Sequence, residues 1–173
     1  MILEVVDPET GKPVPEGERG EIVLTLFGQL AQPMIRFGIE DVVENRFADE
    51  PCACGRTHRR LLNPIVGRAG DPFTVKGRAF LPFDVEQVLA RIPETTGLYQ
   101  IRVTSGADQA ALRVRVETQH ARDDAAYQEL VAQRLREGLG VPAEVELLAP
   151  GGVPISGYKA QIIVKEPAPS PAG

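Results

Sequence analysis

The chain has 173 residues, of which 43% are hydrophobic and 25% are charged, a composition typical of a globular protein with one ordinary domain or two small ones. Its 19 Lys and Arg residues against 24 Asp and Glu residues give a net charge of −5, which argues against nucleic acid or an anionic membrane as the main partner. The first residues lack the pattern of a signal peptide. No apolar stretch approaches the roughly 20 residues that span a bilayer, so we expect a cytoplasmic protein.

Residues 1–65 are predicted to form strands and turns. Apolar or alternating runs at 3–6, 21–26, 34–37 and 42–47 are typical of strands, and the Pro- and Gly-rich segments at 7–11 and 13–17 are typical of turns. No helical periodicity occurs in this part of the chain.

Two helices are predicted in residues 66–166. Val85, Val88, Leu89 and Ile92 share one helical face, and Pro93 and Gly97 end that helix. Asp123 or Asp124 caps the second helix, and Gly138 and Gly140 end it. Its expected buried stripe consists of Tyr127, Leu130, Val131 and Leu135.

Four strands are predicted around these helices: one that precedes the helix at 85–92, and three at 99–104, 112–117 and 141–148. Residues 112–117 alternate, which predicts apolar side chains facing inward and charged side chains facing outward. The predicted fold class is therefore α+β: a small β-rich subdomain over 1–66, then a ferredoxin-like βαββαβ domain over 67–166. Residues 167–173 are rich in Pro and Ala and are expected to form a disordered tail.

Several short motifs follow one another in a specific order. Gly67-Arg68-Ala69-Gly70-Asp71 is followed by motifs at 73–77 and 80–86, and is preceded by motifs at 20–25 and 33–41. Pro154-Ile155-Ser156-Gly157-Tyr158-Lys159-Ala160 comes near the end. Over residues 2–164 this order resembles the C-terminal portion, hinge and lid, of phenylacetate-CoA ligase-like adenylate-forming enzymes. Such enzymes join a carboxylate to AMP, and a thiol then attacks the mixed anhydride while the lid rotates between the two steps.

The resemblance implies a nucleotide site at Asp41 and Arg68. Asp41 matches the carboxylate that holds the ATP ribose, and one carboxylate can accept from both ribose hydroxyls. Arg68 matches the hinge arginine that reaches the same ribose. The chain departs from the family pattern at Ile39 and Glu40, which replace the usual Thr-Gly, and at Gly70, which replaces the usual pivot Asp or Lys and loosens the hinge.

The resemblance also implies roles in the lid for Lys159 and Gly77. Lys159 matches the catalytic lysine of the adenylation step, which offsets the charge that builds in the transition state. The three preceding family positions differ, with Ile155, Gly157 and Tyr158 in place of Arg, Glu and Gly. Gly77 matches a glycine that borders the pantetheine tunnel, although a simple turn glycine is an equal interpretation.

Cys52 and Cys54 lie in a Cys-Ala-Cys-Gly-Arg-Thr-His segment that resembles an element found in many phenylacetate-CoA ligases. Two close thiolates supply half of a tetrahedral zinc site, which His58 or a group elsewhere would complete. The favoured interpretation is a reduced turn without metal, because no fourth ligand is evident.

No segment resembles the Ser/Thr/Gly-rich phosphate loop of these ligases. We therefore expect a chain that uses ATP, AMP and CoA only together with an N-terminal ligase portion, in trans if necessary. The alternatives are a non-catalytic binding or interaction module derived from the lid fold and a small-molecule-sensing βαββαβ domain. An exposed apolar face is expected on residues 1–65, and a homodimer would cover it.

Overall fold

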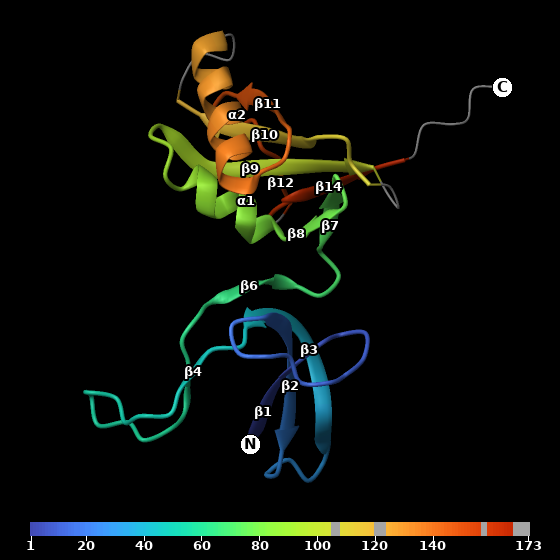
Figure 1. Cartoon of the computed structure of the whole chain (residues 1–173), viewed down its shortest axis with the longest axis vertical. Coiled ribbons are helices and arrows are strands. Elements are labelled where there is room, and N and C mark those ends of the chain that lie inside the picture. The colour runs from blue at the N-terminus through green and yellow to red at the C-terminus, as the bar shows by residue number, and fades with distance from the viewer. Residues whose placement is uncertain (105–107, 120–123, 157–158, 168–173) are drawn as a thin grey trace, which may run out of the picture. The chain divides into compact units, whose positions relative to one another are not determined.

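The computed structural model describes residues 1–104, 108–119, 124–156 and 159–167, with the backbone alone at 156, 159 and 160. The chain divides into two compact units, Met1–Gly70 and Asp71–Gly173 (Figure 1). The sequence places the boundary slightly earlier, after residue 66. Most of the predicted tail, residues 168–173, lies outside the described residues.

The first unit consists of strands. An antiparallel sheet has the order β1-β2-β3-β6, and two short strands, β4 and β5, pair separately. The bounds are β1 (Ile2–Val6), β2 (Arg19–Leu26), β3 (Met34–Glu44), β4 (Phe47–Ala48), β5 (Arg60–Leu61) and β6 (Ile65–Arg68). Residues 1–70, all described, contain no helix, in agreement with the absence of helical periodicity.

Strand β3 is one long strand where the sequence predicts two shorter ones. Its register with β2 shifts between Glu21 and Val23, so the segment 39–41 bulges opposite Ile22. The bulge interrupts the alternation on which the sequence prediction depends. Val43, which is fully buried, packs with Val5 and Ile22 in the small core of this unit.

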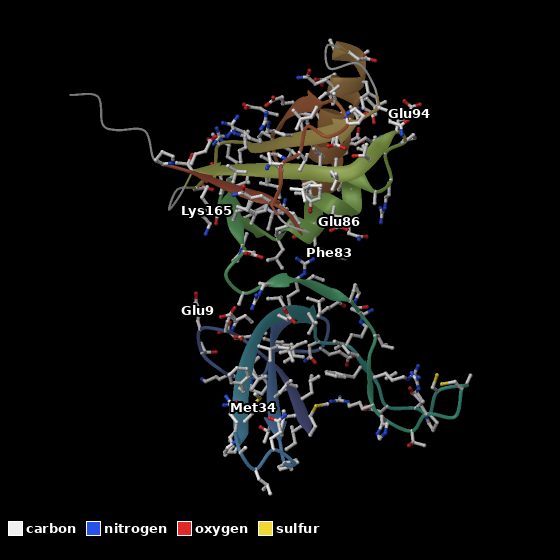
Figure 2. The ribbon with its side chains drawn as sticks, turned by 180° about the vertical axis from the view of Figure 1, so that it is seen from behind. Glu9, Met34, Phe83, Glu86, Glu94 and Lys165 are labelled. Atoms are coloured by element: carbon white, nitrogen blue, oxygen red, sulfur yellow. The ribbon has the colours of Figure 1, made fainter. Side chains whose placement is uncertain are left out.

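The second unit is a helix-covered sheet. Its elements are β7 (Phe73–Val75), β8 (Arg78–Phe80), α1 (Pro82–Leu89), β9 (Thr95–Thr104), β10 (Leu112–Thr118), α2 (Ala125–Leu139), β11 (Ala143–Leu148), β12 (Ile155–Ser156), β13 (Lys159–Ala160) and β14 (Ile163–Glu166). The main sheet has the order β11-β10-β9-β14. α1 and α2 lie side by side against it (Figure 1). Figure 2 shows the opposite side, with Lys165 on the edge strand β14.

The predicted fold class, α+β with a β-rich part followed by a helix-covered lid, is confirmed. The succession α1-β9-β10-α2-β11 follows the predicted order. Two details of the sheet differ from a simple βαββαβ unit. The first strand is a separate β7–β8 hairpin, and β14 completes the sheet by pairing in parallel with β9.

The starts of both helices and the end of α2 follow from local chemistry. The prediction that α1 continues to Ile92 and is ended by Pro93 and Gly97 is wrong, because α1 ends at Leu89 and Gly97 lies in β9. α1 begins three residues before the predicted Val85 because Pro82 is tolerated in a first turn, and the Asp84 carboxylate accepts the Leu81 N–H at 2.8 Å. Asp124 caps α2 by accepting the Tyr127 N–H, and Gly140 ends α2 in the left-handed conformation, with φ of 68°.

The predicted stripe of α2 is correct at Val131 and Leu135, which are completely buried. It is wrong at Leu130, which is 41% exposed, because the buried face continues through Ala132 and Leu139 instead. No helix among the described residues is long and apolar enough to cross a membrane.

Candidate functional site

Asp41 and Arg68 occupy opposite positions in the β3–β6 ladder. Residues paired directly across antiparallel strands carry their side chains on the same face of the sheet. The structure therefore brings together the two residues to which the sequence assigns the ribose. Asp41 is half-buried and Arg68 is exposed, so the arginine can reach a solvent-borne ligand beside the carboxylate.

Glu40 forms an ion pair with Arg68. Its Oε2 lies 2.6 Å from Nη2 of Arg68, and both side chains are mostly exposed. Glu40 has a φ of 65°, a region that L-residues other than Asn, Asp and His rarely adopt. The Glu40 N–H donates to Oε1 of Glu21 at 2.9 Å, and its carbonyl accepts the Ala69 N–H at 2.8 Å.

The sequence marks Glu40 as a departure from a glycine, and the backbone supplies the physical reason for that glycine. A residue without Cβ adopts positive φ without strain. Sequence reasoning identifies Glu40 as a replacement for that glycine. It misses the ion pair, because Arg68 lies 28 residues farther along the chain.

Gly77 lies at the tip of the β7–β8 hairpin. Lys76 and Gly77 have φ values of 51° and 74°, the combination of a tight hairpin turn, and the Gly77 N–H donates to the Asp108 carboxylate at 3.0 Å. A Cβ at Gly77 would have no heavy-atom neighbour within 4 Å. Backbone conformation alone therefore explains this glycine, and a channel-lining role remains a prediction.

Lys159 begins β13, which pairs with β12 in a two-stranded hairpin. Ser156 and Lys159 are register partners. The Gln161 N–H donates to the Pro154 carbonyl at 3.4 Å, and this hydrogen bond closes the base of the β12–β13 hairpin. Lys159 therefore lies in a hairpin held at its base, separate from the β7–β8 hairpin of Gly77.

Glu117 on β10 is the buried acid that sequence reasoning misses. The alternation of residues 112–117 predicts that it faces outward, which is correct for the half-buried Arg113 and Arg115 and wrong for Glu117, which is only 3% exposed. The segment 151–153 covers it. The one feature of the sequence that distinguishes Glu117 is its charge, because the other two charged residues of β10, Arg113 and Arg115, are basic.

Several donors surround the Glu117 carboxylate. Oε2 accepts the Val153 N–H at 3.2 Å, and Oε1 accepts the Thr96 hydroxyl at 3.0 Å. Burial by itself would raise the pKa of Glu117, but the N–H groups of Val153, Gly151 and Gly152 and the Thr96 hydroxyl together hold the pKa below its usual value. The carboxylate is therefore ionised at neutral pH.

Cys52 and Cys54 are free thiols in a tight turn. The turn is closed by Cys52 N–H to Arg56 C=O at 2.9 Å and Gly55 N–H to Cys52 C=O at 2.8 Å. Among the described residues, which include Cys52, Cys54 and His58, no group of three or more His, Cys, Asp or Glu could hold a metal ion. Zinc at this turn is therefore not supported.

Comparison with known proteins assigns the family. Residues 77–166 match the model of the AMP-binding enzyme C-terminal domain, so the chain belongs to that family. A phenylacetate-coenzyme A ligase of Thermus thermophilus is 36% identical over 174 residues, covering 90% of this chain and 38% of the relative. That of Escherichia coli is 27% identical, covering 91% of this chain and 36% of the relative.

A solved structure supports the same assignment. A 2-hydroxyisobutyryl-CoA ligase, crystallised in the postadenylation state with R3-HIB-AMP, has a TM-score of 0.82 and 30% identity. The similarity covers 95% of this chain and 35% of that ligase. The chain thus corresponds to the C-terminal part of adenylate-forming ligases and spans little more than a third of the length of the relatives.

Proposed function

We propose that this chain is the hinge and lid of a phenylacetate-CoA ligase-like acyl-CoA synthetase, which converts a carboxylate, ATP and CoA into an acyl-CoA through an acyl-adenylate. The observation that carries the proposal is the pairing of Asp41 with Arg68. It places a carboxylate and a guanidinium, the two groups that the family directs to the ribose, on one face of one sheet. The Thermus and E. coli relatives carry the name of this activity.

Each proposed residue has a defined task. Asp41 accepts the ribose hydroxyls and Arg68 donates to the same sugar. Lys159 offsets the negative charge that develops between the carboxylate and the α-phosphate during adenylation. Gly77 borders the thiol's path during thioester formation. The phosphate-binding loop and the acyl pocket belong to the N-terminal portion, so activity requires that portion, covalently joined or supplied in trans, in the cytoplasm where ATP and CoA are available.

A chimera tests the proposal. The region of the Thermus ligase that this chain matches is replaced by the whole chain, and phenylacetate-dependent pyrophosphate exchange and acyl-CoA formation are measured. We expect both activities, with pyrophosphate exchange reduced at least about 100-fold in Lys159→Ala. Lys165→Ala, on the edge strand β14, is the matched control and should retain the exchange.

The second candidate is a non-catalytic module that keeps the lid fold. The Glu40–Arg68 ion pair favours it, because the guanidinium assigned to the nucleotide already has a carboxylate partner. A chimera that folds, as judged by its circular dichroism, but shows neither partial reaction would support this candidate and contradict the ligase proposal.

We also propose that the first unit self-associates when no N-terminal portion covers it. Its exposed apolar side chains include Phe27, Leu30 and Ile35, which are 69%, 94% and 78% exposed. Such exposure is typical of a surface that another protein covers. Light scattering of the isolated chain should give the mass of a dimer, and a monomer at millimolar concentration would contradict the proposal.

A further inference from the structure

The hairpin that contains Lys159 is attached to the main sheet by two buried polar side chains. They are Glu117 on β10 and Gln100 on β9, which are 3% and 2% exposed. Buried polar side chains destabilise a fold unless hydrogen bonds satisfy them. Both are satisfied by the backbone of the segments that flank the hairpin, one on each side.

The incoming segment is attached to Glu117. The carboxylate accepts the Val153 N–H at 3.2 Å, and the Gly152 N–H donates to the Ala149 carbonyl at 2.9 Å. The segment fits tightly at Gly152, where a Cβ would lie 2.8 Å from the Ala149 carbonyl oxygen. A buried, ionised carboxylate thus holds the backbone of this segment at Val153, just before β12.

The outgoing segment is attached to Gln100. Its Nε2 donates to the Gln161 carbonyl at 3.0 Å, and the neighbouring Ile101 N–H donates to the Ile162 carbonyl at 2.7 Å. Arg115 lies opposite Gln100 in the β9–β10 ladder and donates to its Oε1 at 3.4 Å, which orients the amide. The hairpin therefore leaves and rejoins the sheet at two fixed points.

We propose that Glu117 is a positioning residue for the adenylation step: its carboxylate fixes the segment 151–153 and thereby the place of Lys159. The inference rests on the proposed function of Lys159. Electrostatic stabilisation of a transition state requires a preorganised charge, and misplacement by about 1 Å can cost on the order of 100-fold in rate. Gln100 provides the complementary attachment on the other side.

Glu117→Gln removes the charge at nearly constant shape. The new amide nitrogen cannot accept the Val153 N–H, which Oε2 accepts in the unaltered chain. Glu144→Gln is the matched control, because Glu144 lies in the adjacent strand β11 with an exposed side chain and is opposite Arg113 rather than Arg115. In the intact chain, we expect hydrogen exchange at the Val153 amide to accelerate at least about tenfold in Glu117→Gln and to stay unchanged in Glu144→Gln.

The chimera with the Thermus N-terminal portion tests the catalytic consequence. In Glu117→Gln we expect kcat for pyrophosphate exchange to fall about 10- to 100-fold with KM for ATP little changed. Thioester formation from supplied acyl-adenylate should stay within about twofold, because that step does not use Lys159. An equal loss in both partial reactions would overturn the inference, and so would an unchanged adenylation rate.

Failure of the proposed function gives a different result. If the chimera containing the unaltered chain does not adenylate, then the ligase proposal fails, and the catalytic role of Glu117 fails with it. If the unaltered chimera is active and Glu117→Gln matches it, then only the inference about Glu117 is wrong.

Discussion

Arg68 on β6 lies directly opposite Asp41 on β3 and also binds the carboxylate of Glu40, the residue just before Asp41. Arg68 therefore pairs with Glu40 and lies across the strand pair from Asp41. Because the Arg68 and Glu40 side chains are both more than half exposed, their ion pair contributes only about 0–1 kcal/mol to stability. A pair this weak can be exchanged for a ligand.

Glu40→Gly and Glu40→Ala separate backbone strain from charge. Both substitutions remove the ion pair, but only glycine relieves the left-handed conformation at φ of 65°. We expect the glycine variant to exceed the alanine variant in free energy of unfolding by about 1 kcal/mol, measured by urea denaturation. Equal stabilities would mean that residue 40 relaxes out of the left-handed region.

Glu40→Gln tests competition for Arg68 in the chimera. Removing the negative charge frees the guanidinium and lowers repulsion of the nucleotide, so KM for ATP should fall by up to about fivefold. Arg68→Ala should raise it. Raising the salt concentration should shrink the effect of Glu40→Gln, since the pair is exposed. A KM that rises in Glu40→Gln would show that Glu40 assists nucleotide binding.

Glu117 should make stability depend on pH in the acid range. Its pKa is lower in the folded than in the unfolded chain, so its contribution is fully present above the unfolded value near 4.5 and is lost as the pH falls through the folded value. Glu117→Gln should lower the free energy of unfolding by about 1–3 kcal/mol at pH 7, since the buried Val153 N–H loses its charged acceptor.

The measurement is urea denaturation of the unaltered chain and of Glu117→Gln from pH 7 to pH 3. The difference between their free energies of unfolding should be constant down to about pH 5 and should decrease below the ordinary carboxyl pKa. A gap that stays constant to pH 3 would mean that Glu117 titrates alike in the folded and unfolded chains.

Cys52 should react faster than Cys54. Hydrogen bonds from the Cys54 backbone and thiol, with the nearby Arg60 charge, lower the pKa of Cys52 and outweigh its desolvation. The thiolate is the nucleophile, so iodoacetamide at pH 7 should modify Cys52 first, as mass spectrometry of peptides would show. Cys54→Ala should slow the reaction at Cys52, because the thiol donor is removed. Preferential labelling of Cys54 would contradict this assignment.

Gly77→Asn distinguishes a turn glycine from a channel glycine. Asn tolerates positive φ, so the β7–β8 turn should survive and the melting temperature should change little. If Gly77 borders the path of the thiol, then acyl-CoA formation falls while pyrophosphate exchange stays constant. If both acyl-CoA formation and pyrophosphate exchange are unchanged, then the only role of Gly77 is in the β7–β8 turn.

Local patterns predict the second unit well. Val85 and Leu89 in α1, Val131 and Leu135 in α2, and the Asp124 and Gly140 caps all follow from interactions within one or two helical turns. Leu130 is the exception within α2, because the surface that α2 buries depends on where β11 and α1 pack, and the end of α1 at Leu89 rather than Ile92 is a second exception. No local pattern carries that information.

The sequence predicts the individual residues of the candidate site but not their arrangement in space. The motifs identify Asp41 and Arg68, but the pairing of β3 with β6 brings them together. The burial of Glu117 depends on the segment at Val153, 36 residues later, that folds back over β10. The half-buried Arg113 and Arg115 of the same strand give no warning of it. Such long-range contacts determine the burial and the pKa of Glu117, and no periodic sequence pattern predicts them.

Both attachment points of the Lys159 hairpin, Glu117 and Gln100, lie inside the second unit. In the proposed ligase, Lys159 therefore moves with the second unit as a whole, and substitutions at Gly70 or Asp71 should change the rotation of that unit and leave the attachment of Lys159 unchanged. The second unit should therefore be exchangeable between ligases. Fusing residues 71–166 to the N-terminal portions of different ligases should keep the Lys159 hairpin intact, so that only the residues at the junction would need to be optimised.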